Sequence, residues 1–95
     1  MSSTMITKRF RIRGTVQGVY FRASARNTAR ELGLTGWVRN VADGSVESLV
    51  SGPEDAVEQF AVWLWRGPEG ATVTKVEVAV EANTTFAGFE ILRSY

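Results

Sequence analysis

Apolar and polar residues alternate along the first part of the chain. From Ile6 to Ile12 the apolar side chains largely share one parity, and the other parity carries the arginines Arg9, Arg11 and Arg13. A period of two residues predicts a strand with one buried and one solvent-facing side. The arginine row could be read as an RNA-binding face. Charged residues at every second position are more typical of the solvent-exposed face of an antiparallel strand, so we assign no site to this row.

Two later stretches have the spacing of amphipathic helices. From Phe21 to Leu32 apolar residues recur every three or four positions, and Gly33 followed by Leu34 is typical of a C-terminal cap. A second helix is predicted to begin at 52–55, where a proline and two carboxylates suit a first turn. It should end at 67–68, a Gly-Pro pair. We expect its buried stripe to be Val57, Phe60, Ala61 and Leu64, with Trp63 and Trp65 covering the edge of the core.

The remaining apolar runs have the character of strands. Gly36 to Val41 and Ser45 to Ser51 are joined by turn residues at 42–44, which predicts a hairpin. The stretch from Thr72 to Glu81 is rich in valine, but its parity slips once after Val73, which predicts a bulge. A polar turn then leads to a short last strand.

That last strand is expected at Phe89 to Ile91. The order of elements is then strand, helix, strand, strand, helix, strand and a short extra strand, which is the βαββαβ order of ferredoxin-like α+β folds. We therefore expect an antiparallel sheet with two helices on one face. Residues 1–95 should form a single domain, because a chain of this length holds one hydrophobic core.

The composition excludes several kinds of binding partner and catalytic group. Eleven Lys and Arg against ten Asp and Glu give a net charge of +1, so no overall basic field favours nucleic acid or membrane. The chain contains no Cys and no His, which excludes disulfides, thiolate nucleophiles, imidazole bases and the usual zinc ligands. The first residues lack an apolar signal segment, and no apolar run reaches membrane-spanning length. We expect a cytoplasmic monomer without metal or cofactor.

The stretch 14–22, Gly-Thr-Val-Gln-Gly-Val-Tyr-Phe-Arg, connects the first strand to the first helix. Gly14 and Gly18 allow the backbone to bend, and the N–H groups of 16–20 and of the helix start suit an anion. A cation at a helix N-terminus is disfavoured unless an anion lies beside it, and Arg22 stands there. An ordinary glycine loop with a solvent-exposed arginine explains this stretch equally well when it is taken alone.

The expected topology places a second polar side chain, that of Asn40, near the stretch 14–22. The end of the predicted strand at 36–41 should lie near the loop at 14–22, which makes Asn40 a candidate neighbour of the stretch from Gly14 to Arg22. An asparagine can hold a water molecule but cannot take its proton, and an arginine matches phosphate oxygens with its planar fork. Such a pair could hydrolyse only a phosphate with a good leaving group, such as a carboxylic-phosphoric anhydride. Asn40 would otherwise be an ordinary residue flanking a turn.

The stretches 14–22 and 36–47 closely resemble the two signatures of the acylphosphatase family. The resemblance implies hydrolysis of acyl phosphates to carboxylate and inorganic phosphate, without a metal or a covalent phosphoenzyme. It implies that Arg22 binds phosphate and that Asn40 orients water. The family's phosphate-binding loop corresponds to Thr15, Val16, Gln17, Gly18, Val19 and Tyr20. Departures at Glu69 and Leu92 lie away from this chemistry.

The alternative is a non-catalytic ferredoxin-like module that binds RNA or regulates another domain. The fold alone permits it. The near-neutral charge speaks against RNA, as does the lack of the two aromatic strand motifs that stack bases in common ferredoxin-like RNA binders. We therefore expect a small-molecule acyl phosphate and inorganic phosphate as the partners, with neither nucleic acid nor membrane.

Overall fold

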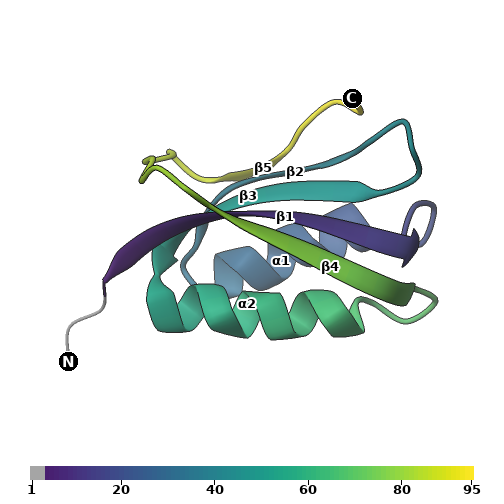
Figure 1. Cartoon of the computed structure of the whole chain (residues 1–95), viewed down its shortest axis with the longest axis horizontal. Coiled ribbons are helices and arrows are strands. Elements are labelled where there is room, and N and C mark those ends of the chain that lie inside the picture. Colours follow the sequence, from purple (N-terminus) through teal and green to yellow (C-terminus); the bar gives the residue numbers. More distant parts are fainter. Residues whose placement is uncertain (1–3) are drawn as a thin grey trace.

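The computed structural model describes residues 4–95. Two helices lie on one face of a five-stranded sheet (Figure 1). In chain order the elements are β1 (Met5–Thr15), α1 (Phe21–Glu31), β2 (Thr35–Asn40), β3 (Val46–Pro53), α2 (Glu54–Arg66), β4 (Thr72–Glu81) and β5 (Phe89–Ile91). This is the predicted βαββαβ order with a short extra strand, and the ferredoxin-like fold is confirmed.

The sheet has the strand order β4-β1-β3-β2-β5. The pairs β1–β3, β1–β4 and β2–β3 are antiparallel as expected, whereas β5 pairs with β2 in parallel. Chain direction explains this difference. Strands β1 and β2 run in the same direction, because both are antiparallel to β3 between them. Strand β4 is antiparallel to β1, so it also runs opposite to β2. The turn after β4 reverses the chain, so β5 runs in the direction of β2.

The predicted irregularity in β4 is present. Arg13 pairs with Lys75, but the next residue, Gly14, pairs with Val73. Thr74 of β4 is therefore an extra residue without a partner in β1, between the two pairs. A bulge of this kind bends the strand pair where β1 ends, directly before the loop that enters α1.

The core lies between the helices and the sheet, and Phe60 of α2 is at its centre. Its ring lies 6.2 Å from that of Phe10, 6.1 Å from Phe89 and 6.1 Å from Trp63, measured between centroids. Trp63 thus covers the core edge as expected. Trp65 does not, because it is 53% exposed on the outer side of α2, and Ala61 is only partly buried.

The C-terminal end of α1 has the predicted cap. The N–H of Gly33 donates to the carbonyl of Arg30 over 3.1 Å, and that of Leu34 donates to the carbonyl of Ala29 over 2.9 Å. Leu34 is only 3% exposed, so it folds back onto the apolar side of the helix. This cap fixes the direction in which the chain enters β2.

The face of the sheet opposite the helices carries an ionic network. The buried carboxylate of Glu47 accepts hydrogen bonds from Arg9 at 2.7 Å and from Arg39 at 2.9 Å. Arg13 reaches Asp43 at 3.2 Å and Glu77 at 3.3 Å. The arginine row of β1 is therefore paired with acidic residues on the solvent side of an antiparallel strand, as expected. Within residues 4–95 no helix is both long and apolar enough to cross a membrane.

Candidate active site

The β1–α1 loop and the β2–β3 turn lie at the same end of the molecule (Figure 1). Strands β1 and β2 run in the same direction, because each is antiparallel to β3 between them. Their carboxyl ends therefore meet at one edge of the sheet. This places the segment after Thr15 beside the segment that begins at Asn40, as the topology argument expected.

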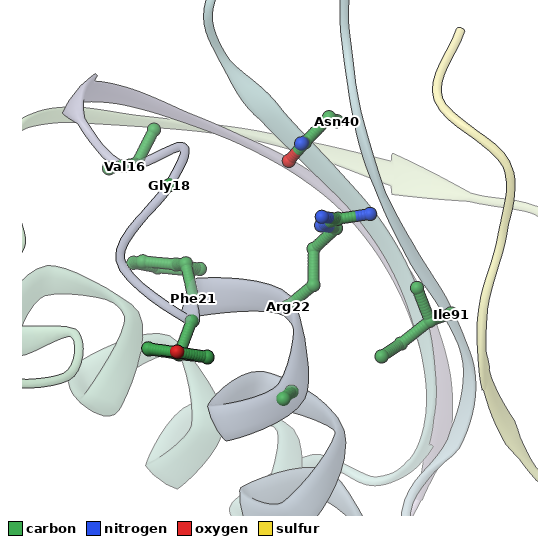
Figure 2. A pocket seen from close by; sticks show the side chains of 8 residues that line it. Val16, Gly18, Phe21, Arg22, Asn40 and Ile91 are labelled. Carbon is green, nitrogen blue, oxygen red and sulfur yellow. The ribbon is translucent and has the colours of Figure 1, made fainter.

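A pocket of about 350 Å³ lies between these two segments. Figure 2 shows the guanidinium of Arg22 and the amide of Asn40 directed into the same space, from α1 and from the end of β2. Ile91 of β5 lies on the side of Arg22 away from the loop. The lining residues are Val16, Gly18, Tyr20, Phe21, Arg22, Ala23, Asn40 and Ile91.

The backbone N–H groups of residues 17–23 make no hydrogen bond to a backbone carbonyl of any described residue. The first amide with such a partner is that of Ser24, which donates to the carbonyl of Tyr20 over 3.0 Å. The N-cap, Tyr20, contributes no side-chain acceptor, and the first turn of α1 contains no acidic residue. These N–H groups and the positive end of the helix dipole are therefore available to an anion.

The two glycines of the stretch 14–22, Gly14 in β1 and Gly18 in the loop, have different roles. Gly14 has φ 129°, and a β-carbon added there would lie 2.1 Å from the carbonyl oxygen of Thr72 in β4. Its small size therefore serves the close approach of β1 to the bulged strand. Gly18 has φ 79°, and an added β-carbon would have no neighbour within 4 Å. Because Gly18 lines the pocket, its exposed backbone is open to a ligand.

The predicted loop residues do not all face the pocket. Val16, Gly18 and Tyr20 line it. Tyr20 has φ 62°, an unfavourable left-handed conformation for a residue with a side chain, and this turns the chain into α1.

The other loop residues point elsewhere. Thr15 is the exposed last residue of β1 and pairs with Thr72, and Val19 packs against the core. Gln17 directs its amide to the β2–β3 turn.

Arg22 is a half-buried cation in the first turn of α1, and it forms no ion pair with any acidic residue among residues 4–95. Arg26, Arg30, Arg66 and Arg93 likewise form no ion pair among residues 4–95, whereas the arginines on the opposite face of the sheet each have a carboxylate within 4 Å. A positive side chain beside a positive helix end is unfavourable without an anion. The predicted conflict between Arg22 and the helix is thus a feature of the structure.

The backbone of Asn40 is held on both sides. It pairs with Val46 of β3 on one side, and on the other its carbonyl accepts a hydrogen bond of 2.8 Å from the N–H of Tyr95. The side-chain oxygen Oδ1 is buried and accepts no hydrogen bond from any residue the structure describes. A buried acceptor without a partner costs free energy, so this atom is suited to a hydrogen-bond donor that enters the pocket.

Sequence reasoning missed the contacts of the tail and of Gln17. The N–H of Ala42 donates to the carbonyl of Tyr95 over 3.0 Å, so the tail continues the edge of the sheet past Asn40. Arg39 lies between the rings of Trp37 and Tyr95, with its Cζ atom 4.7 Å and 4.2 Å from their centroids. No local pattern in the tail signals this pairing, because it depends on the placement of β5.

The turn that follows Asn40 is held by its own hydrogen bonds. The N–H of Val41 donates to the carbonyl of Ser45 over 2.9 Å, and that of Gly44 donates to the carbonyl of Val41 over 3.0 Å. Asp43 accepts hydrogen bonds from the hydroxyl and the N–H of Ser45. These bonds, with help from Arg13, lower the pKa of the exposed Asp43 carboxyl to about 2.

The side chains that line the pocket limit the catalytic groups it can offer. It offers one permanent cation and one amide side chain, and it contains no carboxylate, thiol or imidazole. Within residues 4–95 no group of three or more acidic, His or Cys residues is arranged to hold a metal ion. Among the side chains of the lining, none is a general base near neutral pH. Fold and site together define a ferredoxin-like α/β sandwich with a pocket, lined by Arg22 and Asn40, where β1 and β2 end.

Comparisons with known proteins agree with this class. The family model for acylphosphatase matches residues 8–91. A protein named acylphosphatase from Azoarcus sp. strain BH72 is 54% identical over 90 residues, covering 95% of this chain and 92% of the relative. The chain therefore belongs to the acylphosphatase family.

Solved structures agree as well. An acylphosphatase from Coxiella burnetii superimposes with a TM-score of 0.90 at 36% identity, covering 93% of each chain. Acylphosphatase from Bacillus subtilis gives a TM-score of 0.85 at 33% identity, covering 94% of this chain and 99% of that one. The likeness therefore extends over nearly the whole described fold.

Proposed function

We propose that this protein hydrolyses acyl phosphates to a carboxylate and inorganic phosphate, with Arg22 holding the phosphate and Asn40 orienting the attacking water. The observation that carries the proposal is the facing pair in one pocket. Arg22 is a cation without an acidic partner in the described chain, and the buried Oδ1 of Asn40 lacks a donor. Family membership supports the reaction type.

In this proposal the phosphoryl group occupies the loop end of the pocket. The N–H groups of 17–23 and the fork of Arg22 donate to its oxygens, and the helix dipole favours its negative charge. Because the same groups stabilise charge that builds on these oxygens in the transition state, they contribute to rate as well as to binding. The apolar lining, including Ala23 and Ile91, leaves a surface for the carbon part of the substrate.

Asn40 acts on the water. Its Oδ1 accepts a hydrogen bond from the water and so directs the oxygen toward phosphorus. The bond from water oxygen to phosphorus forms as the bond from phosphorus to the acyl oxygen breaks, and the carboxylate leaves without needing a proton. Neither Asn40 nor Arg22 can accept the proton of the water, so we propose that the phosphoryl oxygens take it.

Hydrolysis of benzoyl phosphate, followed by the loss of its absorbance, tests the proposal. We expect turnover well above the uncatalysed rate, and the same rate when a strong chelator is present. A rate equal to background would overturn the proposed function. A rate abolished by the chelator and restored by a divalent cation would overturn the proposal that Arg22 and the loop amides alone hold the phosphate.

A further inference from the structure

One side chain connects the two halves of the pocket. The amide nitrogen Nε2 of Gln17 donates to the carbonyl of Val41 over 2.8 Å and to the carbonyl of Ser45 over 2.9 Å. Gln17 belongs to the β1–α1 loop, whereas the two carbonyls belong to the β2–β3 turn. Val41 directly follows Asn40, so one of these hydrogen bonds ends one residue from the proposed water-holding side chain.

No other direct polar contact joins the same two segments. Among residues 4–95, the hydrogen bonds and ion pairs between 16–23 and 40–45 are the two from Gln17. The β1–β3 ladder ends at the pair of Ile12 with Val46, before the loop begins. Besides the apolar packing of Val16 and Phe21 in the core, the two hydrogen bonds of Gln17 are therefore the direct link between the loop and the turn that follows Asn40.

The carbonyls that Gln17 contacts form a fixed platform. Each already accepts a backbone hydrogen bond inside the turn, Val41 from Gly44 and Ser45 from Val41. A carbonyl oxygen can accept two such bonds, so the contacts of Gln17 add to the turn and do not replace its own bonds. A side chain held at two points on a rigid turn has little freedom to move the loop away.

We propose that Gln17 is a positioning residue that sets the separation between the phosphate-holding loop and Asn40. The inference rests on the proposed function. It predicts that the loss of the Gln17 side chain lowers kcat but leaves the affinity for phosphate nearly unchanged. All groups proposed to hold phosphate lie on one continuous segment, 16–23, and remain together without Gln17. The water-holding amide lies on the other segment, so its distance from phosphorus is what the loss of Gln17 alters.

The variant Gln17→Met tests this because methionine has a similar length and no N–H donor. We expect kcat for benzoyl phosphate to fall about tenfold to about a hundredfold, as expected for a misplacement on the order of 1 Å. The Kd for inorganic phosphate, measured by calorimetry, should stay within about twofold because the cradle is unchanged. Gln59→Met, at an exposed position on α2, is the matched control and should change neither value.

A double mutant separates positioning from a general structural defect. In an Asn40→Ala background the water-holding side chain is absent, so Gln17→Met should lower kcat by less than about twofold more. An equal fractional loss in both backgrounds, or a rise in phosphate Kd matching the fall in kcat, would overturn the inference. If Gln17→Met does not fold, Gln17→Asn, which is too short for both contacts, is measured in the same way.

The test distinguishes this inference from the function on which it rests. No turnover by the unmodified protein would overturn both. Normal turnover by the unmodified protein together with a normal kcat for Gln17→Met would overturn the role of Gln17 and leave the proposed hydrolysis standing.

Discussion

Arg22 should lower the stability of the protein when no anion is bound. It is a cation in the first turn of α1, where the helix dipole is positive, and it has no acidic partner in the described chain. The variant Arg22→Met keeps an unbranched stem of similar length and removes the charge. We therefore expect this substitution to stabilise the free protein, although it removes a residue proposed to be essential for activity.

The size of the effect follows from the place of the charge. A like charge at a helix end costs about 0.3–1 kcal/mol near the surface. For a domain of this size that is a rise in Tm of roughly 1–8 °C. In the presence of phosphate we expect Arg22→Met to lower Tm instead, because the variant loses two charge-assisted hydrogen bonds to phosphate of about 1.5–3 kcal/mol each. Phosphate affinity should then fall roughly 10²- to 10⁴-fold.

Thermal unfolding in phosphate-free buffer and in increasing phosphate measures both effects. Arg66→Met is the matched control, because Arg66 lies in the last turn of α2, where a cation is favoured. It should lower Tm without changing the response to phosphate. A lower Tm for Arg22→Met in phosphate-free buffer would show that Arg22 stabilises the fold, and an undiminished response to phosphate would refute its binding role.

Three further results are expected. Gly14→Ala should destabilise the protein by more than Gly18→Ala in chemical denaturation, because its β-carbon would meet Thr72 at 2.1 Å whereas Gly18 has open space; equal losses would contradict the separate roles of the two glycines. Burial by itself raises the pKa of Glu47, but hydrogen bonds from Arg9 and Arg39 outweigh it and hold the pKa below the ordinary value of a glutamate. Stability from Glu47 is therefore present above that value and is lost as the pH falls through the lower pKa of the folded state, so Glu47→Gln should weaken the acid dependence of Tm. The kcat of the unmodified protein should vary little across neutral pH, since the described pocket lining has no titrating base there, and a steep rise would indicate one.

Most of the fold follows from local patterns in the sequence. The parity of β1, the Gly33-Leu34 cap and the slipped parity after Val73 each correspond to an observed feature. These features depend on residues close together in the chain, which is why spacing alone predicts them. The parallel pairing of β5 follows only from the order of strands in the whole sheet.

The site could be predicted in part for the same reason. The juxtaposition of Arg22 and Asn40 follows from two strands that end at one edge, and the pocket between them agrees with that expectation. The side chain of Gln17 was not predicted to leave the loop, because its target is a pair of backbone carbonyls that no residue type reveals. Trp65 was predicted to cover the core from its spacing, but the position of α2 over the sheet turns it to solvent.

The division of roles between Arg22 and Asn40 is the central claim, and paired measurements of phosphate Kd and of kcat for benzoyl phosphate test it most directly. Arg22→Ala should weaken phosphate binding and lower the rate together. Asn40→Ala should lower the rate while phosphate Kd stays close to that of the unmodified protein, because its Oδ1 is proposed to hold water and not phosphate. Equal losses of phosphate binding in the two variants would contradict the account.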